Sequence, residues 1–160
     1  DWPAMAKTDD DPDSHSELTD VLQFMRLLWA LVHALDRVSK RMTQELGVTG
    51  PQRLVLRVVG LFPGVSAGRL AMILHVHPST LTGVLRRLCD QRLIARAEHP
   101  DDRRCAVLHL TPRGERVNRA HHGTVEAAVA RALRGISDRD RAAATRVVAH
   151  VTERLTQTRQ

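Results

Sequence analysis

The sequence predicts a mostly helical chain with one small β hairpin late in the fold, and three observations support this expectation. Apolar residues recur at three- and four-residue steps through most of the 160 residues, which is the period of amphipathic helices. The period changes to two between residues 93 and 110, which indicates two short strands. The length suits one compact domain that can bury a core without disulfides or a metal.

A long first helix is expected over residues 17–46, with Gly47 as its C-cap. Its apolar positions follow the helical period at Leu18, Val21, Leu22, Met25, Leu28, Trp29, Val32, Leu35 and Met42. One small core would not cover so wide an apolar face, so the surplus predicts contact with a second chain.

Three shorter helices should follow, over residues 49–61, 67–74 and 78–91. Thr49 and Gln52 have the spacing of a capping box for the first of them, and Ser66 is placed to cap the second. His77-Pro78 opens the third, because proline is tolerated in the first turn of a helix. Residues 66–91 therefore predict a helix, a short turn and a second helix.

Two strands and two further helices complete the expected fold, at residues 93–98, 105–110, 112–133 and 137–156. Alternation in the second strand predicts that Ala106, Leu108 and Leu110 share one face. Thr111 and Ser137 are the expected N-caps of the two helices.

Charge is distributed unevenly along the chain. The whole sequence carries +6, but residues 1–20 hold seven acidic residues and one lysine, so the other 140 residues carry +12. Arginine accounts for 22 of the 24 basic residues and suits phosphates and guanine edges, although a high-GC coding bias is an alternative source of the excess. The positive body favours a nucleic-acid partner. With four aromatic residues, stacking on single-stranded bases is not favoured.

Residues 1–16 are acidic and polar, and we expect them to be disordered. They are unlike a secretory signal peptide, and Met5 is the expected natural start, with the four residues before it a remnant. No apolar run approaches the roughly 20 residues of a membrane span, so no membrane partner is expected. Cys89 and Cys105 predict no secreted disulfide framework, which favours a cytoplasmic setting.

The helix expected over residues 78–91 has two unlike faces. Its apolar face, expected to point into a core, carries Leu81, Val84, Leu85 and Leu88. Its other face is small, hydroxylated and basic, and carries Ser79, Thr82, Gly83 and Arg86, flanked by Thr80 and Arg87. Small residues permit close approach to DNA, while hydroxyls and arginines bond to base edges and phosphates. The pattern predicts insertion into a major groove, with an ordinary solvated helix face as the alternative.

Arginines also gather on the expected hairpin. Arg96 lies on its first strand, and Arg103 and Arg104 lie in its tip. A basic hairpin after a helix-turn-helix is typical of a winged helix, whose wing can place an arginine in the adjacent minor groove. Asp102 can hold a guanidinium in one direction, although a solvent-exposed turn of mixed charge is the alternative. Together, helix and hairpin predict binding to double-stranded DNA.

Four pieces of sequence resemble, in this order, the MarR family of transcriptional regulators: STLTGVLRRL, RLIAR, DDRR and LTPRGE. The resemblance extends over about residues 18–156. It implies a mostly α fold with a small β wing, that is, a winged helix-turn-helix with N- and C-terminal dimerisation helices. Residues 17–48 and 112–157 would form the dimerisation region, and residues 49–111 the DNA-binding lobe.

The resemblance also implies which residues contact DNA. On the reading helix they are Pro78, Ser79, Thr80, Thr82, Gly83, Arg86 and Arg87, and on the wing they are Asp102, Arg103 and Arg104, with Asp102 orienting Arg104 at the tip. Three positions depart from the family pattern. Gly83 stands where arginine is frequent, His77 where an acidic or hydroxyl N-cap is common, and Arg92 where glycine usually precedes the wing strand. These departures affect the DNA contacts and not the fold.

Family members often release DNA when a small aromatic or phenolic anion binds, so the resemblance implies such an effector. Met25, Trp29 and His33 recur along one side of the first helix, with Arg26 adjacent, and would line its pocket. A stripe of core and dimer interface is the alternative reading of the same residues. Peroxide sensing is not expected, because no cysteine precedes residue 89.

No Gly-rich phosphate loop, HExxH or GxSxG motif is present, so no enzymatic activity, catalytic residue or cofactor is expected. The pairs His75/His77 and His121/His122 lack converging ligands, so no metal is expected either. The expected function is that of a sequence-specific transcriptional repressor, a homodimer that binds an inverted-repeat operator in double-stranded DNA. A winged-helix module that binds protein and no operator is the alternative.

Overall fold

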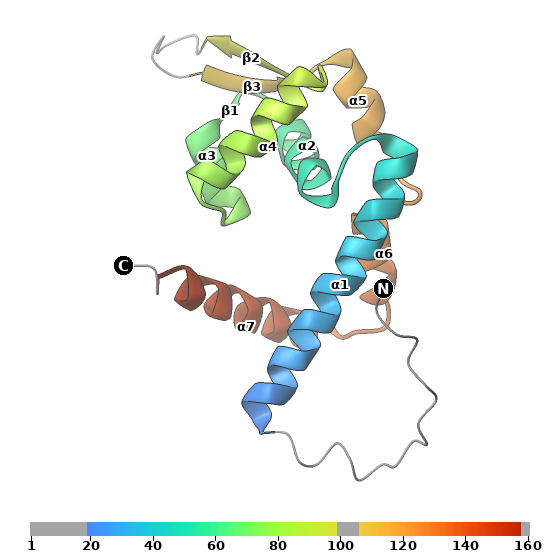
Figure 1. Cartoon of the computed structure of the whole chain (residues 1–160), viewed down its shortest axis with the longest axis vertical. Helices are drawn as coiled ribbons and strands as arrows, with labels where there is room; N and C mark the ends of the chain where they lie inside the picture. Colours follow the sequence, from blue (N-terminus) through green and yellow to red (C-terminus); the bar gives the residue numbers. More distant parts are fainter. Residues whose placement is uncertain (1–18, 99–105, 158–160) are drawn as a thin grey trace, which may run out of the picture.

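A computed structural model describes residues 19–98 and 106–157. Its elements in chain order are α1 (Asp20–Leu46), α2 (Gly50–Leu61), β1 (Val65–Ser66), α3 (Ala67–Leu74), α4 (Pro78–Asp90), β2 (Ile94–Glu98), β3 (Ala106–Leu110), α5 (Pro112–Asn118), α6 (Val125–Ala132) and α7 (Asp138–Gln157). Figure 1 shows one lobe, made of α2 to α5 with the strands, above α6, α7 and most of α1. The fold is mostly helical with a small antiparallel sheet, as the sequence predicts.

The hydrophobic core lies inside this lobe. It draws buried side chains from three helices and from the strands, including Leu56, Val59, Leu70, Leu81, Leu85, Leu88, Ile94 and Leu108. Leu81, Leu85 and Leu88 are at most 2% exposed, and Val84 packs against them from the rim. The inward face predicted for α4 is therefore confirmed, and it fixes which side of the helix remains outside.

Local capping chemistry explains where the helices begin and end. Thr49 and Gln52 make both hydrogen bonds of the predicted capping box at α2. Ser66 accepts a hydrogen bond from the backbone of α3, and Ser137 does the same at α7. Gly47 ends α1 in the left-handed conformation, with φ of 71°.

The sheet has three antiparallel strands in the order β1-β3-β2. The sequence did not predict the two-residue strand β1, which pairs with Val107 and Leu108. Both of these residues are buried, so both faces of β3 are covered at this point, whereas Ala106 is exposed although the strand places it on the same face as Leu108. The reason is that β3 is central only where β1 reaches it, and Ala106 lies beyond β1 towards the hairpin tip.

The single helix predicted over residues 112–133 is two helices, α5 and α6. Gly123 turns the chain with φ of +69°, and the Thr124 side chain accepts the Ala127 N–H to start α6. The carbonyl oxygens of Val117, Asn118 and Ala120, at and just after the end of α5, accept hydrogen bonds from Arg53 of α2. A side chain distant in sequence therefore holds the connection between the two helices in place.

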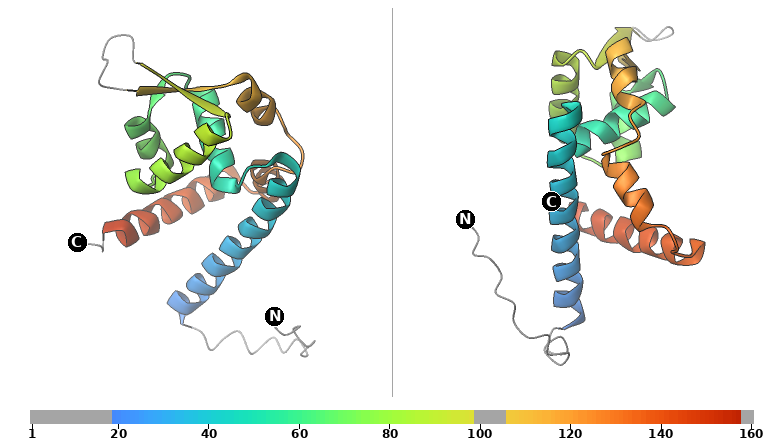
Figure 2. Two further views of the ribbon diagram at one scale, coloured as in Figure 1. Left: turned by 45° about the horizontal axis from the view of Figure 1, so that its top comes forward. Right: turned by 90° about the vertical axis from the view of Figure 1, so that its right-hand side faces the viewer.

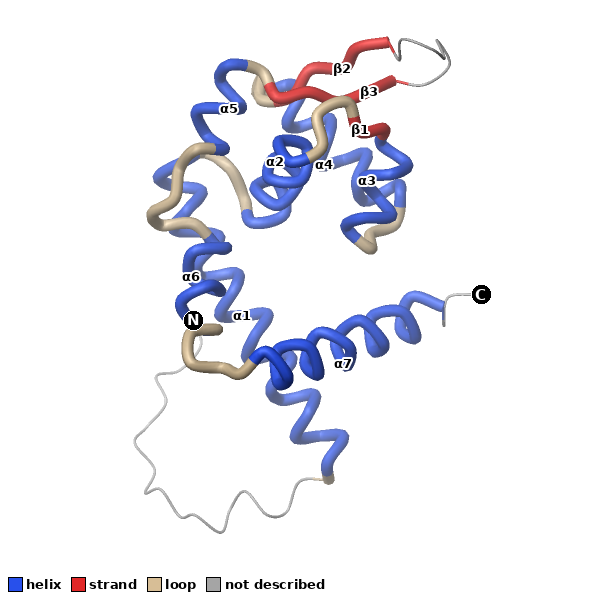
Figure 3. Tube along the Cα trace, turned by 180° about the vertical axis from the view of Figure 1, so that it is seen from behind, coloured by secondary structure: helices blue, strands red, loops and turns tan. Residues whose placement is uncertain are grey.

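Outside the lobe, α1 and α7 expose large apolar side chains. On α1 they include Val21, Leu22, Leu27, Trp29, Leu31 and Val32, and on α7 Val147, Val148 and Leu155. Figure 3, seen from behind, shows the two helices diverging from the region of α6. The surplus apolar face predicted for the first helix is therefore present and uncovered in the single chain. Among the helices that the structure describes, none has the length and apolar character to cross a bilayer.

Candidate nucleic-acid interface

The polar face of α4 is open to solvent. Every residue predicted to contact DNA on this helix is exposed: Pro78, Ser79, Thr80, Thr82, Gly83, Arg86 and Arg87. A Cβ added to Gly83 would meet no atom within 4 Å. The face therefore combines two guanidiniums with small side chains that leave the helix backbone approachable.

The N-terminus of α4 is capped by His77, one of the departures from the family pattern. Its Nδ1 accepts the Ser79 N–H at 3.3 Å and lies 2.7 Å from Ser79 Oγ. The Ser79 hydroxyl and the Ser79 N–H thus both lie within hydrogen-bond distance of this one ring nitrogen. The Thr82 hydroxyl donates to the Pro78 carbonyl at 2.9 Å. Both hydroxyls thus offer oxygen acceptors outward, which match the amino donors of cytosine and adenine.

The helix-turn-helix is closed by a tight turn between α3 and α4. His75 takes the left-handed conformation there, with φ of 51°, and its N–H returns to the last turn of α3. Arg69, in the first turn of α3, is exposed and adds a cation to the same motif. The predicted helix, short turn and helix are confirmed.

The hairpin β2–β3 extends from the lobe on the side where α3 and the start of α4 lie (Figures 1 and 2). Arg96 on β2 is exposed. The predicted wing-tip residues Asp102, Arg103 and Arg104 lie outside the described residues. The hairpin and the reading helix are therefore displayed towards one side of the lobe, as a winged helix requires.

The base of the hairpin is tied to the start of α5. Thr111 Oγ1 donates to the Arg92 carbonyl at 2.6 Å and accepts the Gly114 N–H at 3.0 Å. The Thr111 N–H donates to the Leu93 carbonyl at 3.1 Å. Arg92, where the family pattern has glycine, keeps the left-handed conformation with φ of 56°. At this position an arginine therefore occupies a conformation that favours glycine.

Comparison with known proteins agrees with this architecture. Residues 46–104, which run from the end of α1 into the wing, match the MarR family. Over these residues the chain is similar to that family and has its winged helix-turn-helix fold. An HTH-type transcriptional repressor of Mycobacterium tuberculosis is 35% identical over 88 residues, covering 55% of this chain and 63% of that protein. The chain spans between half and about two thirds of the length of the first curated relatives it matches.

Solved structures extend the likeness over most of the fold. The crystal structure of a MepR-like protein complexed with pseudoligands is 25% identical, with a TM-score of 0.72 over 86% of this chain and 97% of that one. The S. aureus MepR–DNA complex is 19% identical, with a TM-score of 0.67 over 89% and 100% of the two chains. These likenesses show that the helices outside residues 46–104 also follow the MarR-family fold.

A wide cleft separates the lobe from α7. Its volume is about 1590 Å³, and its walls include Met72, Leu74, His75, Ile136 and Arg141. The residues predicted to bind an effector, Met25, Arg26, Trp29 and His33, are all exposed on α1. None of these four lines the cleft.

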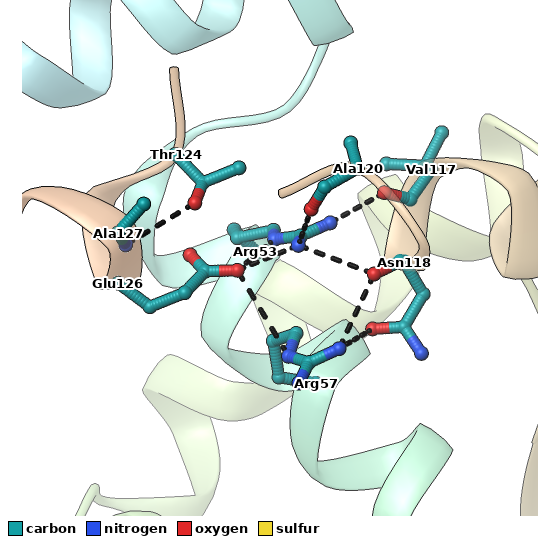
Figure 4. Close-up of polar contacts among 8 residues, drawn as sticks. All are labelled: Arg53, Arg57, Val117, Asn118, Ala120, Thr124, Glu126 and Ala127. Carbon is teal, nitrogen blue, oxygen red and sulfur yellow. Dashed lines mark hydrogen bonds and ion pairs between the residues drawn. The ribbon is translucent and has the colours of Figure 1, made fainter. Parts of the chain in front are cut away.

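Sequence analysis missed a buried charge cluster beneath the lobe (Figure 4). Arg53 is 1% exposed and pairs with Glu126 of α6, while Arg57 lies beside both. Burial raises the pKa of the Glu126 carboxyl, but the hydrogen bonds and charge of Arg53 outweigh this and lower it below 4.5. One signal was available, because Arg53 shares the inner helical stripe of α2 with Leu56.

The cysteines and histidines were also candidates for a metal site. No three His, Cys, Asp or Glu side chains among residues 19–98 and 106–157 are grouped to hold a metal ion. Cys89 is half-buried and packs against the core, as expected for a small apolar residue. Cys105 lies outside the described residues.

Proposed function

We propose that the chain is a sequence-specific regulator that binds double-stranded DNA through α4 and the wing and represses transcription. The observation that carries the proposal is the open face of α4, with Arg86 and Arg87 beside two outward hydroxyl oxygens and an unobstructed Gly83. The relative from Mycobacterium tuberculosis is named a transcriptional repressor, and the S. aureus structure of the same fold is a DNA complex. Both support a regulatory role at DNA.

We further propose that the active species is a homodimer on an inverted-repeat operator. The apolar side chains of α1 and α7 are exposed to water, which is unfavourable, and a second copy of the chain would bury them. A two-fold pair presents two reading helices to successive major grooves, about 34–36 Å apart. The operator should therefore have two half-sites one helical turn apart.

The test begins with selection of binding sequences from random duplex DNA by the full chain. Binding of the selected duplex is then measured by fluorescence anisotropy for the wild type, Arg86→Gln and Arg113→Gln. Arg113 is an exposed arginine of α5 and serves as the charge-matched control. If Arg86 contacts a base, its loss weakens binding by about 1–3 kcal/mol. Arg113→Gln should leave binding almost unchanged.

Two outcomes would contradict the DNA proposal. Failure to enrich any duplex would favour the module that binds protein and no operator. Equal losses in both variants would indicate non-specific charge attraction, because a base contact is lost only with Arg86. A steep fall of affinity with salt is expected in any case, since phosphate contacts release counterions.

We also propose that a small aromatic acid or phenol releases the DNA. Two places are candidates, the α1 residues around Arg26 and the cleft beside Arg141, whose guanidinium is paired with Asp138 and lies among apolar walls. A thermal-shift screen with benzoate and salicylate identifies a ligand through the rise in melting temperature. Repeating it with Arg26→Gln and Arg141→Gln assigns the site, because only the variant at the true site loses the shift. No shift with any aromatic acid would contradict the proposal.

A further inference from the structure

A buried guanidinium fastens the DNA-binding lobe to the helices outside it. Arg53, on α2 of the lobe, donates from Nε and Nη2 to Glu126 Oε1 at 2.8 and 2.6 Å. Its other bonds go to the carbonyl oxygens of Val117, Asn118 and Ala120. Figure 4 shows these acceptors arranged around the one side chain. Few side chains other than arginine supply donors in so many directions from one point.

The acceptors belong to three successive pieces of chain. Val117 and Asn118 end α5, Ala120 lies in the connection, and Glu126 is in the first turn of α6. Carbonyls at a helix C-terminus carry partial negative charge, so they add to the attraction of the carboxylate. Since α6 packs against α1, the same guanidinium holds the lobe to the part of the molecule that carries the exposed apolar helices.

Arg57 and Asn118 reinforce this connection. Arg57 Nη1 donates to Asn118 Oδ1 at 3.1 Å and to the Asn118 carbonyl at 3.2 Å. Asn118 in turn packs on Gly60, where an added Cβ would lie 2.6 Å from Asn118 Nδ2. The connection between α5 and α6 is thus held to two consecutive turns of α2, and it restrains the angle of the lobe together with the direct packing of α1 on α2.

We propose that Arg53 and Glu126 are positioning residues that set the half-site spacing accepted in the operator. This rests on the proposed function, because it concerns the geometry with which a dimer presents two reading helices. Adding one base pair between half-sites moves one of them by about 3.4 Å and rotates it by roughly 35°. A lobe held at one angle rejects such a duplex, whereas a loosely held lobe tolerates it.

The first experiment measures affinity for three duplexes, with the selected spacer and with one base pair added or removed. Glu126→Gln keeps the size of the side chain and removes its negative charge. Arg53→Lys keeps the positive charge but removes the planar guanidinium that donates in several directions. Asp36→Asn is the control, because it breaks an exposed ion pair with Lys40 inside α1. We expect the preference for the native spacer to fall at least about fivefold in Glu126→Gln and Arg53→Lys, and not in Asp36→Asn.

A single half-site duplex separates positioning from other roles. Its affinity should stay within about twofold of wild type in Glu126→Gln, since a lone lobe binds without regard to spacing. An unchanged spacer preference would overturn the proposal. A loss on the half-site as large as the loss on the full operator would also overturn it, because the cluster would then shape the reading helix itself.

A measurement without DNA keeps this inference apart from the proposed function. Spin labels at Gln44→Cys on α1 and Met72→Cys on α3, with Cys89 and Cys105 replaced by alanine, report the distance between lobe and α1. Diluting with unlabelled protein leaves one labelled chain in each assembly. The distance distribution should broaden in Glu126→Gln and not in Asp36→Asn. Equal widths would overturn the positioning role, whereas broadening without any operator binding would contradict only the proposed function.

Discussion

Gly114 and Leu93 are in direct backbone contact. A Cβ on Gly114 would lie 2.0 Å from the carbonyl oxygen of Leu93, the same oxygen that accepts the N–H of Thr111. This places the first turn of α5 against the residue that leads into β2. The contact between the base of the wing and α5 therefore leaves no room for a side chain at residue 114.

Gly114→Ala should destabilise the fold by about 1–3 kcal/mol, because the new methyl group clashes with the Leu93 carbonyl oxygen. This oxygen belongs to the backbone and cannot move aside by a change of rotamer. Urea unfolding followed by circular dichroism measures the change. Gly68→Ala is the matched control, since it also lies in a helix but its Cβ meets nothing within 4 Å. Equal midpoints for Gly114→Ala and wild type would contradict the backbone contact.

Gly83→Ala should separate stability from DNA binding. In an exposed helix interior, alanine is favoured over glycine by about 0.5–1 kcal/mol, so the midpoint of unfolding should rise. If DNA approaches the helix backbone at this position, the methyl group should weaken operator binding by about 1–3 kcal/mol, as in other overpacked contacts. If Gly83→Ala gains stability and keeps its affinity for the operator, Gly83 is not part of the DNA interface.

Arg92→Gly should stabilise the protein. Arg92 has φ of 56°, and a non-glycine residue in the left-handed conformation costs roughly 1–2 kcal/mol. Part of that gain is offset by the greater freedom of glycine in the unfolded chain, which leaves an expected increase of about 0.5–1 kcal/mol. Its neighbour Gln91 has φ of −75°, so Gln91→Gly should instead destabilise. Thermal unfolding of both variants compares the signs.

Glu126 should make stability depend on acidity. Its folded-state pKa lies below 4.5, so its ionised form stabilises the fold at pH values above that value. This contribution is lost as the pH falls through the lowered folded-state pKa. Melting temperatures of wild type and Glu126→Gln should therefore differ near neutrality and converge in strong acid. A constant difference across the range would show that the charge on Glu126 contributes nothing.

Trp29→Glu should shift the assembly towards monomer. Trp29 is 60% exposed on α1 among other apolar side chains, and a charge there would be costly to bury against a second copy. Sedimentation velocity at micromolar concentration measures the shift. Gln44→Glu adds the same charge at an exposed polar position of α1 and should leave assembly unchanged. A wild-type monomer would contradict the proposed homodimer.

Much of the fold could be predicted because its signals are local. Thr49 with Gln52, Ser66, Thr111 and Ser137 mark helix starts through bonds that span three residues, and each was recognisable in the sequence. The break between α5 and α6 lies at Gly123 and Thr124, and the helical period of the apolar residues around them hid it. The bonds from Arg53 that hold this connection come from more than 60 residues earlier in the chain, and the short strand β1 likewise depends on a distant partner, β3.

The candidate site divides in the same way. The outward face of α4 could be predicted from its apolar stripe. Once Leu81, Leu85 and Leu88 are buried in the core, the residues on the opposite side of the helix must face solvent. The capping role of His77 was not foreseen, since histidine is a rare choice at that position and its geometry depends on the Ser79 hydroxyl. The predicted effector residues of α1 do not line the cleft beside α7, and their role stays a prediction, because a helix pattern does not specify what packs opposite it.

Arg53 changes what the arginine content means for electrostatics. Its side chain is 1% exposed and is paired with Glu126, so it cannot contact the phosphates of a nucleic acid that binds at the surface. The arginine count therefore overstates the cations available to phosphates, and a titration of binding against ionic strength should count fewer phosphates than the arginine total suggests. The formal net charge of +6 is unchanged by this pair, because Arg53 and Glu126 cancel within it.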